Sequence, residues 1–232
     1  MLKRFLAAVG IGTASAANAV PGPYADDATN LIYQLLFCDN LELFQKQHTG
    51  DLRPPWTVLF NKKSSSTDLQ ALANDESAES RVRVLAYNAL RARGEKSPDK
   101  ILLGVILEVG MPEGLDTLAA FADGSARYIN YTGKMAIVEG VPNPFQKEIK
   151  EVLDSSKPII TVIGPWDKDR LPPPSKGMIR ITFLVSDGLY FGQGPTEQMQ
   201  QERLANPVII SGVKLLRKLT EKSTEQGAAA NP

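Results

Sequence analysis

Residues 101–140, ILLGVILEVGMPEGLDTLAAFADGSARYINYTGKMAIVEG, decide the fold of this chain. Asp123 and Gly124 stand between two strand-like runs, where Asp-Gly strongly predicts a hairpin because the turn requires positive φ. A second turn is expected at residues 131–134, and the MAIVE segment after it is apolar enough to form another strand. The stretch therefore predicts four strands in series, paired as an antiparallel meander.

The first of these strands, ILLGVILEV, is apolar on both of its faces. Strict alternation puts Leu103, Val105 and Leu107 on one face, with Leu102 and Ile106 on the other. Since neither face is polar, this strand is expected in the middle of a covered sheet.

Residues 178–186, MIRITFLVS, predict another strand by their alternation. Its inward side chains are expected to be Ile179, Ile181, Phe183 and Val185, with Arg180, Thr182 and Ser186 on the opposite face. Asp187-Gly188 predicts a second hairpin into LYFGQG. The expected fold class is therefore α+β, an antiparallel sheet of about six strands with helices covering at least one face.

Helical periodicity and capping residues predict helices on both sides of the sheet in the sequence. They are expected near residues 26–37, 67–73, 77–93, 143–155 and 206–222. Residues 56–60, WTVLF, are interpreted as a short strand or a buried plug, residues 158–164, PIITVIG, as a strand, and residues 45–55 as a surface loop. The expected organisation is a leader over residues 1–20, a single domain over residues 24–222 and a disordered tail over residues 223–232.

The leader, MLKRFLAAVGIGTASAANAV, allows two interpretations. Lys3 and Arg4 before an apolar segment and a run of small residues have the outline of a signal peptide. The alternative is a retained amphipathic helix with Leu2 and Phe5 on its apolar face, which docks on the domain, a partner or a membrane surface. Peripheral membrane contact through residues 1–12 follows from the second interpretation.

The first fourteen residues, MLKRFLAAVGIGTA, resemble the opening residues of the arrestin-like sporulation-control protein family. The resemblance implies a retained leader in a cytoplasmic protein associated with envelope stress. That family is all-β, and its fold is not carried over because this chain turns helical after the leader. We therefore expect a cytoplasmic protein, whereas a cleaved leader would make it secreted or periplasmic.

Composition excludes several classes of function. The 26 Lys and Arg residues balance the 26 Asp and Glu residues, so the chain lacks the positive field that nucleic acids require. No apolar run is long enough to cross a membrane. The lone cysteine, Cys38, follows an apolar helix and is expected to be buried and inert, while the lone histidine, His48, leaves zinc without enough ligands. No phosphate-binding motif and no calcium-loop spacing occur, so no cofactor or metal is expected. A magnesium or calcium site made of carboxylates alone stays open, because Asp and Glu are plentiful.

By elimination, the sequence favours a non-catalytic accessory or adaptor protein that binds a partner protein. An aromatic rim with two cations is the candidate binding surface, provided that the two Asp-Gly hairpins are neighbours in the sheet. Its candidate residues, together with one from the leader, are Phe5, Arg127, Tyr128, Tyr131, Lys134, Trp166, Tyr190 and Phe191.

Two alternatives stay open. One is a small-ligand-binding sensor with a pocket between sheet and helices. The other is an exported hydrolase that acts through carboxylates, with Asp116, Asp123, Glu139 and Asp187 as the available candidates.

Overall fold

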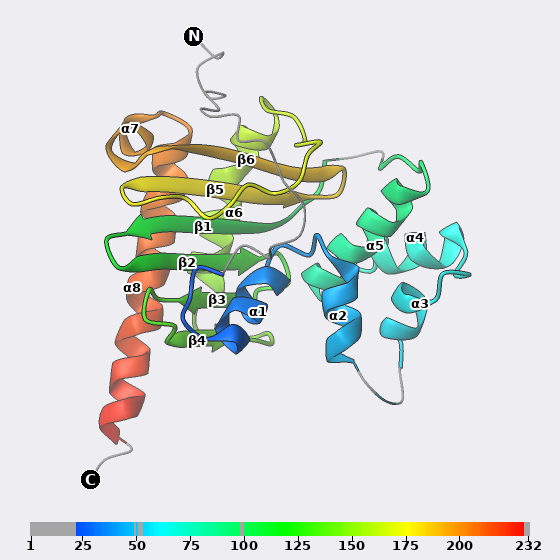
Figure 1. Ribbon diagram of the computed structural model, residues 1–232, viewed down its shortest axis with the longest axis horizontal. Coiled ribbons are helices and arrows are strands. Elements are labelled where there is room, and N and C mark those ends of the chain that lie inside the picture. The colour runs from blue at the N-terminus through cyan, green and yellow to red at the C-terminus, as the bar shows by residue number, and fades with distance from the viewer. Residues whose placement is uncertain (1–21, 49, 51–52, 98–99, 230–232) are drawn as a thin grey trace.

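The computed structural model describes residues 22–48, 50, 53–97 and 100–229. Within these residues, helices pack on both faces of a six-stranded antiparallel sheet, and a further group of helices lies beside it (Figure 1). The predicted α+β class is confirmed, and helices cover both faces of the sheet. The leader, with Phe5 and the residues assigned to membrane contact, lies outside the described residues.

The sheet has the strand order β4-β3-β2-β1-β5-β6. Its strands are β1 (Leu102–Met111), β2 (Gly114–Phe121), β3 (Ala126–Ile129), β4 (Met135–Val138), β5 (Met178–Val185) and β6 (Gly188–Pro195). The first four form the predicted meander, and β5 returns to pair with the free side of β1. The apolar β1 is therefore central, as its sequence indicates.

The faces of β1 differ from strict alternation at its start. Its register against β5 shifts between Leu102 and Gly104, and this irregularity reverses the faces of the residues before it. Leu103 consequently packs with Ile106 in one core, while Val105 packs in the other. The expectation that Leu103 shares a face with Val105 was wrong because periodicity alone does not reveal a bulge.

The first helical layer precedes the sheet in the chain. It comprises α1 (Asp27–Leu35), α2 (Leu41–Gln47), α3 (Trp56–Phe60), α4 (Ser66–Asn74) and α5 (Ser80–Ala92). Helix α1 lies across one face of the sheet, and the other four helices form a group beside the sheet (Figure 1). Asp26 caps α1 by accepting a 2.8 Å hydrogen bond from the Thr29 amide, as the sequence predicts.

The second layer covers the opposite face with α6 (Gln146–Ile160), α7 (Thr196–Gln201) and α8 (Ala205–Ala229). Two ion pairs of 2.6 Å join α8 to α6, Lys214 with Glu151 and Lys218 with Glu148. Helix α8 crosses behind the sheet and extends past β4 (Figure 1). It was expected to end near Lys222, but its backbone stays helical to Ala229.

Three local expectations were wrong. Residues 56–60 form helix α3 rather than the short strand, because two prolines lead into a turn that the amide of Val58 closes on the Pro55 carbonyl at 3.1 Å. The alternative of a buried plug fits better, since Leu59 is buried in the first core. The PIITVIG segment forms no strand: its first three residues end α6, where Ile159 and Ile160 are buried against the second core, and the residues that follow form a turn. The segment expected as a loop begins inside α2, whose Phe44 is buried.

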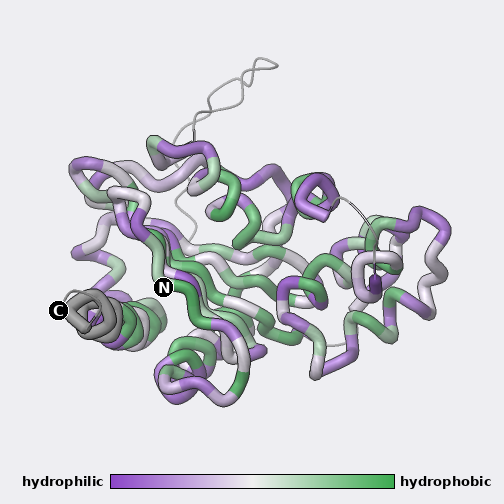
Figure 2. Tube along the Cα trace, turned by 90° about the horizontal axis from the view of Figure 1, so that it is seen from below, coloured by the Kyte–Doolittle hydropathy of each residue, from purple (hydrophilic) through white to green (hydrophobic). Residues whose placement is uncertain are grey.

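Hydrophobic residues concentrate in the sheet and on the helix faces that meet it (Figure 2). Cys38 is fully buried, as predicted, and burial raises the pKa of its thiol. Among the described helices, none has the length and apolar composition needed to cross a membrane.

Candidate functional site

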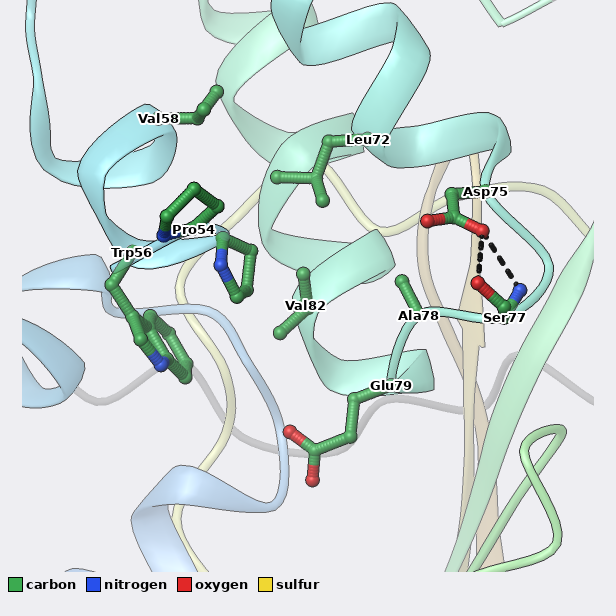
Figure 3. Close-up of a pocket in the computed structure, with 10 residues that line it drawn as sticks. Pro54, Trp56, Val58, Leu72, Asp75, Ser77, Ala78, Glu79 and Val82 are labelled. Carbon is green, nitrogen blue, oxygen red and sulfur yellow. Dashed lines mark hydrogen bonds between the residues drawn. The ribbon is translucent and has the colours of Figure 1, made fainter. Parts of the chain in front are cut away.

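An apolar groove opens between α3, the start of α5 and the segment that joins α4 to α5 (Figure 3). Its volume is about 450 Å³. The lining residues are Pro54, Pro55, Trp56, Val58, Leu72, Asp75, Ser77, Ala78, Glu79 and Val82. Because most of these side chains are apolar, the groove suits a hydrophobic group.

Trp56 is held in place by an aromatic cluster. Its ring lies 6.1 Å from Phe44, 5.4 Å from Phe60 and 3.8 Å from His48, measured between ring centroids. His48 is fixed in turn by a 2.8 Å hydrogen bond between its Nδ1 and the Phe44 carbonyl. Trp56 is only partly buried, so a rigid aromatic surface lines the groove.

One side of the groove carries carboxylates. Asp75 accepts hydrogen bonds from the hydroxyl (2.6 Å) and the amide (2.9 Å) of Ser77, and these bonds hold its pKa below the ordinary value. Glu79 forms a 2.7 Å ion pair with Arg81. Figure 3 shows Asp75 and Glu79 across the groove from Trp56. Asp75 is therefore an ionised acceptor, while the charge of Glu79 is partly neutralised.

A second notable feature is a polar row that crosses the sheet. Thr117, Glu108, Arg180 and Gln193 lie opposite one another on β2, β1, β5 and β6. Tyr33 of α1 donates a 2.6 Å hydrogen bond to Oε1 of Glu108, and Nη1 of Arg180 lies 3.6 Å from Oε2 of the same carboxyl group. The row thus places an ion pair inside the molecule, on the face covered by α1.

The proline-rich connection over residues 164–177 completes the cover of this row. Arg180 donates from Nη1 to the Leu171 carbonyl at 3.1 Å, and from Nη2 to the Pro172 carbonyl at 2.5 Å. Arg170 in the same connection pairs with Asp39 at 2.7 Å. The connection is therefore fixed to its own sheet and to the end of α1.

Burial determines the chemistry of the polar row. The exposed fraction is 0% for Glu108 and 2% for Arg180. Burial raises the pKa of Glu108 and lowers the pKa of Arg180, so each group favours its neutral form more than it does in water. Through Tyr33 and through the carbonyls of Leu171 and Pro172, the row fastens α1 and the proline-rich connection to the sheet.

The predicted aromatic rim is divided by the topology of the sheet. Strand β1 separates the two Asp-Gly hairpins, β2–β3 and β5–β6. The strands that carry the aromatic candidates, β3 and β6, consequently lie about 19 Å apart at the usual strand spacing. The expectation that the hairpins are neighbours was wrong, because β5 pairs with β1 and not with the end of the meander. The candidate residues therefore lie in two groups.

The group at β6 consists of two half-buried aromatic residues and one that is fully buried. Trp166 packs against Phe191 edge to face, with ring centroids 5.0 Å apart, and its amide donates to the Leu189 carbonyl at 2.7 Å. Tyr190 points to the other face, is fully buried and donates a 2.8 Å hydrogen bond to Asp187. Trp166 and Phe191 thus lie together, without Tyr190.

The group on the β3–β4 hairpin is also divided. Arg127 is buried and forms an ion pair with Glu139, while Tyr128 lies on the opposite face. Tyr131 is 41% exposed, and Lys134 is exposed in the same turn. Only these last two residues offer their side chains to solvent, and partner binding through them stays a prediction.

The carboxylates of the hydrolase alternative already have local partners. Asp116, Asp123, Glu139 and Asp187 accept hydrogen bonds or form ion pairs with nearby groups.

The sensor alternative requires a pocket between the sheet and the helices. A hollow of about 160 Å³ between Phe37 of the first layer and Leu189 of β6 is smaller than typical ligand pockets of about 300–1,000 Å³. In the part of the chain that the structure describes, no three His, Cys, Asp or Glu residues are grouped to hold a metal ion.

Sequence reasoning missed Trp56 and Glu108. Glu108 is the only charged residue in residues 101–111, and a lone charge in a strand apolar on both faces indicates a buried partner. Trp56 follows two consecutive prolines, which mark a fixed turn rather than a strand. Both signals are present in the sequence, but neither identifies the partner side chains.

Comparisons with protein-family models, with curated proteins and with solved structures found no match. The function is therefore argued from the geometry of the chain itself.

Proposed function

We propose that this protein is a non-catalytic adaptor whose groove binds a segment of a partner protein. The segment presents a bulky apolar side chain next to a lysine or arginine. The observation behind the proposal is the groove of about 450 Å³ that has Trp56 on one side and Asp75 on the other. The cytoplasm, during a response to envelope stress, is the proposed setting.

The shape and lining of the groove support an apolar anchor. Its volume lies within the usual range for binding pockets, and Pro54, Val58 and Leu72 add apolar surface beside Trp56. Tryptophan is enriched at positions that contribute most to protein binding, because a rigid ring buries a large area with little loss of conformational entropy. The cluster behind Trp56 already fixes that ring.

The charges at the groove support a cationic neighbour to that anchor. Asp75 is exposed and held ionised, and Glu76 next to it is also exposed. Arg81 offsets part of the charge of Glu79, so Asp75 is the main acceptor. A lysine or arginine of the partner would approach Asp75 while its apolar neighbour contacts Trp56.

The test is a selection of random displayed peptides on the purified full chain, followed by affinity measurements on the enriched peptides. We expect the enriched sequences to share a large apolar residue adjacent to lysine or arginine. Val58→Asp should weaken binding at least tenfold, because it places a charge in the apolar part of the groove. Asp75→Asn should weaken it several-fold and reduce its dependence on salt.

Thr57→Asp is the matched control, since Thr57 is exposed on the same short helix and does not line the groove. All variants should retain the circular dichroism and melting temperature of the parent chain before binding is compared. Enriched peptides that bind Val58→Asp as tightly as the parent chain would show that the groove is not the binding surface. Failure to enrich any common pattern would also contradict the proposal.

A further inference from the structure

Strand β4 forms one edge of the sheet and leaves two large apolar side chains in solvent. Met135 is 40% exposed and Ile137 is 52% exposed, and both lie on the same face of the sheet. The turns on either side add Tyr131 at 41% and Val141 at 57% exposure. Exposed apolar residues on an unpaired edge favour pairing with another strand.

The backbone of this edge is available for pairing. The Asn130 amide donates to the Lys134 carbonyl, which makes residues 130 and 134 a hydrogen-bonded pair at the start of the β3–β4 ladder. Hydrogen-bonded and non-hydrogen-bonded pairs alternate in antiparallel strands. The amides and carbonyls of Met135 and Ile137 consequently point away from β3, toward the open edge.

We propose that β4 pairs antiparallel with β4 of a second copy of this chain, about a two-fold axis perpendicular to the sheet. The two six-stranded sheets then form one continuous sheet. In the register that centres Ala136 on the axis, Met135 lies opposite the partner's Ile137, and Ile137 lies opposite the partner's Met135. Both exposed apolar side chains are covered in this way, and their outward backbone groups are paired.

The charges at the ends of β4 favour a second copy in this orientation. Lys134 precedes the strand and Glu139 follows it, both exposed. Antiparallel pairing brings Lys134 of each copy near Glu139 of the other, where it adds a second cation to the carboxylate that Arg127 of the same chain already binds. Parallel pairing would place the two copies of Lys134 together and the two copies of Glu139 together. The strand is thus complementary to itself, as an interface with two-fold symmetry requires.

Helix α8 supplies a further contact beyond the short strand. It extends past β4 in Figure 1, and Figure 2 views the molecule from that side. From the buried Leu219 to Ala229, ten residues of helix span about 15 Å, the width of roughly three strands. In the proposed dimer this extension lies over the edge of the partner's sheet.

Sedimentation equilibrium of the full chain over a range of concentrations tests the proposal. We expect a monomer–dimer equilibrium, which Ile137→Arg shifts toward the monomer by at least tenfold in dissociation constant. Val162→Arg is the matched control, because Val162 is also exposed, at 44%, but lies far from β4. It is in the segment between α6 and Trp166, and the Trp166 amide binds β6, which is the opposite edge of the sheet. A parent chain that stays monomeric, or an Ile137→Arg variant that dimerises like the parent, would overturn the proposal.

Disulfide cross-linking tests the register separately. Ala136 faces its own symmetry mate as a non-hydrogen-bonded pair, in which the Cα atoms are about 4.5 Å apart, within reach of a disulfide. Ala136→Cys should form a covalent dimer on mild oxidation, and Val162→Cys should not. Buried Cys38 does not compete. Equal cross-linking of the two variants would contradict the pairing of β4 with itself.

Discussion

Replacing Tyr33 with phenylalanine removes one hydroxyl group from the interior and leaves the aromatic ring in place. Tyr33 is fully buried, and its hydroxyl donates to Oε1 of Glu108 at 2.6 Å. The other oxygen of this carboxyl group, Oε2, has no hydrogen-bond partner among the described residues and lies 3.6 Å from Arg180. The substitution therefore leaves the buried carboxyl group without a hydrogen-bond donor.

The expected loss follows from the burial of the acceptor and from its charge, and it applies at a pH at which Glu108 is ionised. A hydrogen bond to a charged group contributes roughly 1.5–3 kcal/mol, compared with about 1 kcal/mol for a neutral one. We expect Tyr33→Phe to reduce the free energy of unfolding by about 2 kcal/mol, because the ring still fills its space and no cavity forms. For a chain of this size, such a loss lowers the melting temperature by roughly 4–8 °C.

The assay is denaturant unfolding of the full chain and of a double-mutant cycle with Glu108→Gln. Tyr24→Phe is the neutral control, since the Tyr24 hydroxyl lies 2.9 Å from the hydroxyl of Thr117 in the same layer. We expect Tyr24→Phe to cost about 1 kcal/mol. The cost of Tyr33→Phe should shrink when Glu108 is already glutamine.

Two results would refute this reasoning. If Tyr33→Phe costs no more than Tyr24→Phe, the carboxyl group does not depend on that hydroxyl. If the cost of Tyr33→Phe is the same with Glu108 and with glutamine at that position, the charge is not the cause.

Three further outcomes are expected. Burial raises the folded-state pKa of Glu108, so its contribution to stability is full below the ordinary carboxyl pKa and is lost as pH rises through the raised value. In denaturant titrations, the free energy of unfolding of the parent relative to Glu108→Gln should therefore fall with rising pH. Gly110→Ala would place a methyl group 2.0 Å from the Ser175 carbonyl oxygen and should cost about 3 kcal/mol in the same assay, whereas Gly164→Ala, with open space around it, should have little effect. Cys38, fully buried with a raised thiol pKa, should react with a thiol reagent only as fast as the chain opens; rapid labelling of the native chain would contradict that placement.

Much of the sheet could be predicted because its signals are local. Asp123-Gly124 and Asp187-Gly188 mark hairpins through the backbone conformations that their turns require, and both hairpins are present. The apolar character of β1 also indicates its central position. The β-bulge after Leu102 could not be predicted, since it depends on how β1 meets β5.

The candidate sites were less predictable than the fold. Sequence reasoning placed the two aromatic hairpins together, but β5 joins the sheet on the far side of β1, and β1 therefore separates the two hairpins. Arg180 and Thr182 were expected on the face opposite the core, yet both are buried, because α1 and the proline-rich connection cover that face. A strand's alternation identifies its two faces but not what covers each of them.

The sequence by itself determined the α+β class, the antiparallel meander, the two hairpins and the burial of Cys38. Each depends on turn chemistry or on hydrophobic periodicity, which act over a few neighbouring residues. Only the tertiary structure decided that Tyr33 meets Glu108, that Trp56 and Asp75 line one groove and that β4 is an open edge. These relations join residues far apart in the chain, so they follow from how the layers pack and not from local pattern.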